Sequence, residues 1–119
     1  MTDWQYGRFD TVWARLTDGR LAVRVDGVKP APWFQARLRP YAPDADSTAD
    51  VQLGLYWHAQ DATPAAEPAA YTASAEVDIR GVEVTVVRVY HASGFVDLRV
   101  RRGTMARGSP NGVLESVPE

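Results

Sequence analysis

The chain has 119 residues, a formal net charge of −2 and no cysteine. A chain of this length forms one domain that buries a single core without a metal or a disulfide. The lack of cysteine excludes a thiol nucleophile, a zinc–cysteine site and a disulfide framework, and the small net charge gives no global attraction for nucleic acid. No apolar run is long enough to cross a bilayer and the first residues lack a signal-peptide pattern, so we expect a cytoplasmic protein without membrane contact.

The first element, residues 2–17, is ambiguous between a helix and a strand. Residues 2–5 fit a helix-capping box, and the apolar residues that follow lie at helical spacing. These are Phe9, Val12, Trp13 and Leu16. We predict an N-terminal helix here; the alternative is that residues 11–16 form a strand that leads into a turn at residues 17–19.

Three later runs alternate apolar and polar residues, which is typical of half-buried strands. They are residues 20–26, 51–58 and 71–80. Residues 33–39 fit a strand but also a short helix after Pro32. Residues 40–50 and 60–70 are rich in proline, alanine and acidic side chains, so we predict surface loops there.

The clearest pattern is a hairpin from Val82 to Arg102. Two runs rich in β-branched residues flank a four-residue turn at 91–94, and in the register that this turn sets every facing pair matches in character. The pairs are Tyr90 with Phe95, Val89 with Val96, Arg88 with Asp97 and Val87 with Leu98. The apolar parity changes near Val86, which predicts a β-bulge that places Thr85 opposite Arg99.

Together these elements predict a single mainly-β domain over residues 1–102. Five or six antiparallel strands would form one strongly curved sheet or small barrel, with the N-terminal helix packed on it. Residues 71–80 would join the hairpin through a tight turn, as a meander. An all-β sandwich with residues 11–16 as a strand is the alternative, and residues 103–119, which lack periodicity, are expected to be a flexible tail.

The sequence contains no convincing catalytic or metal-binding constellation. His58, Asp61 and His91 form a two-histidine, one-carboxylate set, but nothing brings the two strand ends together. His91, Ser93 and Asp97 have the residue types of a catalytic triad, yet they lie too close in one hairpin to adopt its geometry. We therefore expect no enzymatic activity, no metal site and no cofactor.

The candidate binding residues are Tyr56, Tyr90, Phe95, Arg99 and Arg102. The three aromatic residues are expected on the face of the sheet that points away from the core, and the two arginines lack a partner in the predicted pairing. Aromatic rings beside arginines suit the stacking of bases and contact with phosphates. A sheet with apolar side chains on both faces is, however, generally covered on both, here by the N-terminal segment or by another subunit.

These observations leave three functional hypotheses. The first is a non-catalytic interaction or assembly module that binds itself, as a homo-oligomer, or another protein. The second is a single-stranded nucleic-acid-binding small barrel that uses Tyr90, Phe95, Arg99 and Arg102. The third and least favoured is a metal-dependent enzyme around His58 and His91.

Overall fold

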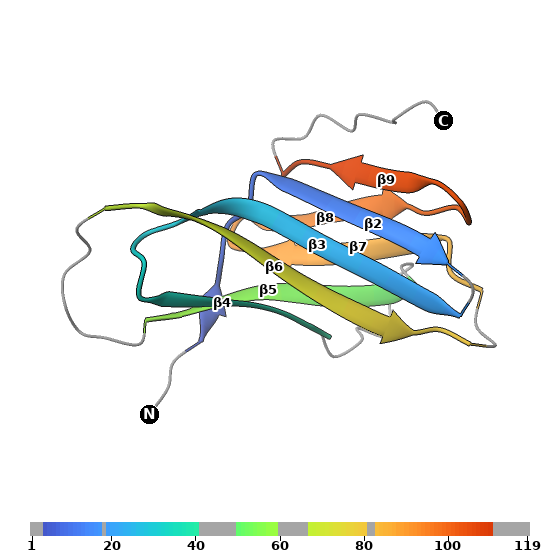
Figure 1. The fold of residues 1–119 in the computed structure, drawn as a ribbon, viewed down its shortest axis with the longest axis horizontal. Coiled ribbons are helices and arrows are strands. Elements are labelled where there is room, and N and C mark those ends of the chain that lie inside the picture. The colour runs from blue at the N-terminus through green and yellow to red at the C-terminus, as the bar shows by residue number, and fades with distance from the viewer. Residues whose placement is uncertain (1–3, 18, 41–49, 60–66, 81–82, 111–119) are drawn as a thin grey trace.

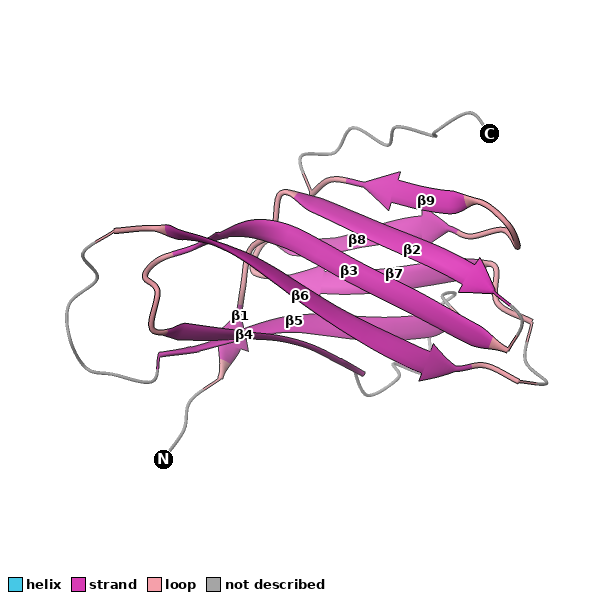
Figure 2. Cartoon of the chain, in the orientation of Figure 1, coloured by secondary structure: helices cyan, strands magenta, loops and turns pink. Residues whose placement is uncertain are grey.

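The computed structural model consists of strands joined by turns and loops (Figure 2). It describes residues 4–17, 19–40, 50–59, 67–80 and 83–110. In this part of the chain there is no helix. A helix able to cross a membrane is therefore also absent from these ranges.

One layer is a four-stranded antiparallel sheet, called sheet B here, with the strand order β6-β3-β2-β9. Its strands are β2 (Thr11–Thr17), β3 (Arg20–Lys29), β6 (Ala69–Asp78) and β9 (Met105–Gly108). The hairpin of β2 and β3 turns at Gly19, whose φ of 76° favours glycine. β6 pairs with β3, and β9 pairs with the other edge of β2.

The second layer, sheet A, is built around one central strand. Its strands are β1 (Gln5–Tyr6), β4 (Phe34–Pro40), β5 (Val51–Ala59), β7 (Val86–His91) and β8 (Gly94–Arg99). β4 lies on one side of β5, while β1 and β7 share the other side, each beside a different half of the strand. The β5–β7 pair is parallel and the other pairs are antiparallel.

The two sheets face each other as the layers of a sandwich (Figure 1), and the core fills the space between them. The largest fully buried side chains come from both layers: Leu21, Leu53, Leu55, Val12, Val23, Val25, Val87 and Val89. Full burial of one such side chain contributes about 2 kcal/mol. The alternation of strand residues thus places one face of each sheet in this common core.

The predicted N-terminal helix and the single curved sheet or barrel are wrong. Residues 11–17 form β2, in which Val12 and Ala14 point into the core while Arg15 is exposed. Both edges of β2 are paired, with β3 and β9, and this tertiary pairing outweighs a helical spacing of apolar residues. The described strands form two separate sheets without a closed barrel, which is the sandwich alternative.

The predicted hairpin register is confirmed. β7 and β8 pair Tyr90 with Phe95, Arg88 with Asp97 and the apolar pairs between them as expected. The bulge is wrong, because Val86 itself faces Arg99 and the Thr85 carbonyl accepts the Val100 N–H at 2.9 Å. The parity changes here because the chain enters sheet A at this point, coming from β6 in sheet B.

The predicted meander is also wrong, because β6 pairs with β3 of sheet B rather than with the hairpin. Residues 105–108, which the sequence assigned to a flexible tail beyond a domain ending at Arg102, form β9. Gly103, with a φ of 85°, makes the turn that carries the chain back to β2. Residues 111–119 of the expected tail, and most of the expected loops at 40–50 and 60–70, lie outside the described residues.

Candidate binding site

The outer face of sheet A carries a group of aromatic side chains. Tyr6 faces Tyr56 across β1 and β5, and Tyr90 faces Phe95 across β7 and β8. Because neighbouring residues of a strand point to opposite faces, these side chains point away from the core that their buried neighbours line. Trp4 precedes β1 and joins them, and we call these five residues the aromatic face.

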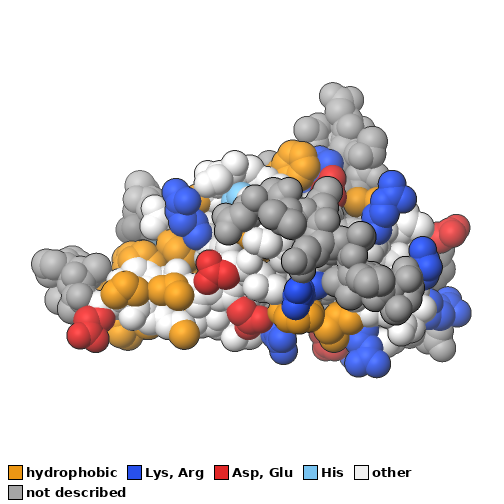
Figure 3. Space-filling model, turned by 90° about the horizontal axis from the view of Figure 1, so that it is seen from above, with side chains coloured by type: hydrophobic (Ala, Val, Ile, Leu, Met, Phe, Trp, Pro, Cys, Tyr) orange, Lys and Arg blue, Asp and Glu red, His pale blue; other side chains and the backbone are white. Residues whose placement is uncertain are grey.

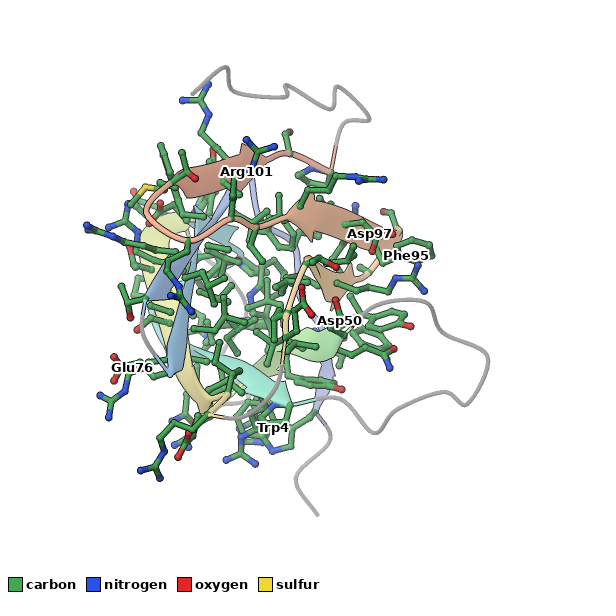
Figure 4. The ribbon with its side chains drawn as sticks, turned by 90° about the vertical axis from the view of Figure 1, so that its right-hand side faces the viewer. Trp4, Asp50, Glu76, Phe95, Asp97 and Arg101 are labelled. Carbon is green, nitrogen blue, oxygen red and sulfur yellow. The ribbon has the colours of Figure 1, made fainter. Side chains whose placement is uncertain are left out.

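The rings of the aromatic face contact one another in pairs. The centroids of Tyr6 and Tyr56 lie 5.2 Å apart with the rings stacked, and those of Tyr90 and Phe95 lie 5.8 Å apart, edge to face. At one end the Trp4 ring lies 5.1 Å from His58. Viewed along the strands, Trp4 and Phe95 lie on the outer side of sheet A, whereas Glu76 projects from the other side of the sandwich (Figure 4).

Gly54 creates the space in which the Tyr56 ring lies. A Cβ atom added to Gly54 would come within 2.7 Å of Tyr56 Cε2 and of its hydroxyl oxygen. Gly54 pairs with Tyr90 on β7 and with Arg39 on β4. The missing side chain therefore lets the Tyr56 ring lie over Gly54, the residue that pairs with Tyr90.

Gly54→Ala is expected to displace the Tyr56 ring while lowering the free energy of unfolding by less than about 1 kcal/mol, because the ring can swing towards solvent. Urea unfolding measures the stability. The chemical shifts of the Tyr6 ring protons measure the displacement, because Tyr6 stacks on Tyr56. Unchanged chemical shifts of Tyr6 would show that the position of the Tyr56 ring does not depend on the space over Gly54.

Arginines border the aromatic face at both ends. Arg37 and Arg39 of β4 place their guanidinium carbons 5.9 and 5.7 Å from the Trp4 ring centroid. Arg99 is exposed on the same side of β8 as Phe95. Contacts of this kind contribute roughly 0.5 to 1 kcal/mol at exposed sites, so here they position the cations more than they stabilise the fold.

Arg88, another cation of this face, is held by two hydrogen bonds to a carboxylate. Its Nε and Nη2 donate to the two carboxylate oxygens of Asp97 at 2.7 and 3.0 Å, and it lies 3.9 Å from the Phe95 ring centroid. The hydrogen bonds to Asp97 raise the pKa of Arg88 further above its usual value. Because Asp97 is 38% exposed, the pair contributes only about 1 kcal/mol to stability. Its main effect is to hold the Arg88 guanidinium over the Phe95 ring.

Gln52 is a buried polar residue within the same face. Only 8% of it is exposed, and its side-chain oxygen accepts the Tyr90 hydroxyl at 2.9 Å. A buried polar group needs such a partner, because leaving it unsatisfied destabilises by about 1 to 3 kcal/mol. The hydrogen bond therefore orients the Tyr90 ring from beneath.

Asp50 ties the start of β5 to the start of β7. Its Oδ2 accepts the Thr85 N–H at 2.8 Å, the Thr85 hydroxyl at 2.9 Å and the Val86 N–H at 2.9 Å, and its own N–H donates to the Val86 carbonyl at 3.0 Å. These hydrogen bonds hold the pKa of Asp50 below its usual value, and the two from backbone N–H groups have the largest effect. The carboxylate thereby sets where the parallel β5–β7 pairing begins.

Asp50→Ala is expected to lower the free energy of unfolding at neutral pH by about 1 kcal/mol, because three donors lose their acceptor at a solvent-exposed position. A depressed folded-state pKa stabilises above the unfolded-state pKa of about 4, and this stabilisation is lost as the pH falls through the folded-state value. Urea unfolding at a series of pH values should show the difference from wild type shrinking below pH about 4. A difference that is constant to pH about 2 would contradict a role for the charge.

The predicted site residues separate into two groups. Tyr56, Tyr90, Phe95 and Arg99 lie together on the outer face of sheet A. Arg102 does not, because the chain leaves sheet A after Arg99 and Arg102 forms a bridge with Leu16 at the end of β2. Viewed from above, basic side chains gather towards this end of the sandwich, where β2 and β6 finish (Figure 3).

The two histidines lie on opposite faces of sheet A. His58 contacts Trp4 on the outer face, whereas His91 is buried against Phe9, and its Nδ1 accepts the Ser93 N–H at 3.1 Å. Burial, with the nearby Arg8, lowers the pKa of His91. One metal ion cannot reach both imidazoles, and the third member of that set, Asp61, lies outside the described residues.

The three residues of catalytic-triad type in the hairpin are not brought together either, because Asp97 binds Arg88 on the outer face while His91 points inward. More generally, no cluster of three or more histidine, aspartate or glutamate side chains suited to a metal ion occurs within the described ranges.

Sequence reasoning missed part of the aromatic face. Trp4 and Tyr6 were assigned to a helix, and Arg37 and Arg39 were not connected with the hairpin. The alternation in residues 33–39 did indicate that both arginines point outward. What it does not encode is that β4 and β1 flank the same strand, β5.

Comparisons with protein-family models, with curated proteins and with solved structures find no match to this chain.

Proposed function

We propose that the protein is a non-catalytic binding module and that the aromatic face of sheet A is its binding surface. The observation that carries this proposal is the exposure of large rings side by side: Phe95 is 49% exposed, Tyr6 38% and Trp4 37%. None of the described strands lies over this face. Contiguous apolar surface on a folded domain is typical of interaction sites, and tyrosine, tryptophan and arginine are the residues that most often dominate binding energy.

The outer face of sheet B supports the same conclusion by contrast. There charged side chains of opposite sign lie near one another, with Arg20 at 3.7 Å from Glu76 and Arg24 at 3.5 Å from Asp26. Its tryptophan, Trp13, is only half-exposed and donates its indole N–H to Asp26 at 3.1 Å. This is an ordinary solvated surface, so the concentration of rings is specific to sheet A.

The binding proposal is tested with one substitution on each outer face. Phe95→Ser removes a ring from the aromatic face, and Met105→Ser is its matched control, since Met105 is 46% exposed on a strand of sheet B. Three kinds of binding are measured: self-association by light scattering, binding of a labelled single-stranded oligonucleotide, and binding of a neutral oligosaccharide by calorimetry.

We expect at least one of these ligands to bind the wild type and to lose about tenfold or more in affinity with Phe95→Ser. Met105→Ser should leave the same affinity unchanged. If no ligand binds, or if both substitutions act equally, the aromatic face is not the binding surface. If the ligand that binds is a second copy of the chain, the protein is a homo-oligomeric module.

A further inference from the structure

We infer that the ligand of the aromatic face is a single-stranded nucleic acid, bound by stacking of bases on the rings and by contact of phosphates with the flanking arginines. This inference rests on the proposed function, since it names the ligand of the same surface. The charge of the face, the length of its row of residues and the poor fit of a second copy of the chain support a nucleic-acid ligand.

The charge of the face favours an anionic ligand, even though the whole chain carries a net charge of −2. Among the described residues, two carboxylates of sheet A and its border are already engaged, Asp97 by Arg88 and Asp50 by backbone N–H groups. Arg39 and Arg99 have no carboxylate partner within the described part of the chain. The surface therefore offers cations at both ends of a row of rings, which is where a bound strand would place its phosphates.

The row of residues that includes Tyr90 and Phe95 is long enough for several successive bases. Arg39, Gly54, Tyr90 and Phe95 face one another in a single row across β4, β5, β7 and β8. With about 4.8 Å between neighbouring strands this row spans roughly 14 Å, the length of about four stacked nucleotides at 3.4 Å each. Rings on an open sheet reach the unpaired bases of a single strand but not those inside a duplex.

A second copy of the chain fits this face less well. A twofold-symmetric contact would place the same patch against itself, so the arginines of one copy would approach those of the other, while Asp97, the carboxylate described on this face, is already bound by Arg88. A neutral sugar would leave the arginines without a role. A nucleic acid uses both the rings and the cations, and because Gln52 is engaged by Tyr90, we expect little dependence on base sequence.

The experiment uses the full chain with a labelled oligothymidylate and, as a second probe, a duplex of the same length. Fluorescence anisotropy should show binding of the single strand in preference to the duplex. The affinity should fall between about 50 and 200 mM salt, because phosphate contacts release counterions. No binding of the single strand at the lowest salt, or equal binding of both probes, overturns the inference.

Substitutions separate stacking from charge. Tyr56→Ala and Phe95→Ala should each weaken binding by about 5-fold to 150-fold, the range found for loss of one stacked base, with little change in salt dependence. Arg39→Gln and Arg99→Gln should each lower the slope of log affinity against log salt by about 0.7. Met105→Ala and Arg15→Gln, both exposed on sheet B, are the controls and should change neither quantity.

The outcomes also distinguish this inference from the proposed function. If the oligonucleotide does not bind but self-association or oligosaccharide binding is lost with Phe95→Ser, the aromatic face is still the binding surface and only the ligand class is wrong. If the arginine substitutions lower the slope of log affinity against log salt while the ring substitutions have no effect, the face is a general anion site and the stacking inference fails. If no ligand responds to any substitution on this face, both proposals fail.

Discussion

Gly7→Ala is expected to lower the free energy of unfolding by about 2 to 3 kcal/mol. A Cβ atom on Gly7 would lie 2.5 Å from Nε1 and 2.6 Å from Cδ1 of Trp57, a residue that is only 6% exposed. Neither partner can move aside easily. The Gly7 N–H donates to the Leu55 carbonyl and its carbonyl accepts the Ala92 N–H, both at 2.9 Å, and overpacking of a filled core destabilises by this amount.

The matched control for Gly7→Ala is Gly54→Ala in β5. In both substitutions the new methyl group meets an aromatic ring, at 2.5 Å for Gly7 and 2.7 Å for Gly54. The Trp57 ring is enclosed, whereas the Tyr56 ring borders solvent. Equal destabilisation of the two variants in urea unfolding would contradict the assignment of Trp57 to the core and of Tyr56 to the outer face.

Leu53→Ala is expected to lower the free energy of unfolding by about 3 kcal/mol, within the 2 to 5 kcal/mol usual for such a cavity. Leu53 is fully buried in the central strand of sheet A, between Pro40 of β4 and Val89 of β7. Strands on both sides hold the backbone in place, so the cavity cannot collapse. Urea unfolding with an unchanged m-value measures the loss.

The control for Leu53→Ala is Val28→Ala in β3, where the side chain is 50% exposed. Its effect should stay within about 0.5 kcal/mol, as for most surface substitutions. If the two variants were equally stable, the two sheets would not enclose a common core at Leu53.

The sequence predicted individual strands well because their signal is local. The register that places Arg88 opposite Asp97 follows from one short turn and two alternating runs, and it is confirmed. Which sheet each strand joins is not a local property. Neither the pairing of β6 with β3 nor the parallel pairing of β5 with β7 is marked by any residue pattern, so the chain was assigned one curved sheet instead of two.

The error at residues 11–17 has a specific physical cause. Trp13 is an apolar residue on the outer face of sheet B, lying 5.7 Å from the guanidinium of Arg24 and 5.3 Å from that of Arg107. Its presence breaks the alternation of β2 and completes a helical spacing with its neighbours. Reading this segment as a helix then removed Tyr6 from the predicted binding face, because the strand that carries it was not expected.

The sequence therefore predicted the central residues of the candidate site but not those at its two ends. Alternation alone was enough to place Tyr56, Tyr90 and Phe95 on one outward face, which the structure confirms. The outer residues depend on where the chain crosses between sheets. The chain is in sheet A at β1 and leaves this sheet for the last time after β8, so Trp4 lies on the face while Arg102 lies away from it.

The placement of β1 and β7 on the same side of β5 affects how quickly the protein folds. Sheet A joins the beginning, the middle and the last third of the chain, and non-local pairings of this kind slow folding to milliseconds or seconds. During synthesis Trp4 and Tyr6 are made before β5, the strand against which they lie. The complete aromatic face therefore exists only once Phe95 has been translated, so a nascent chain stalled before that point should lack the binding surface that we propose.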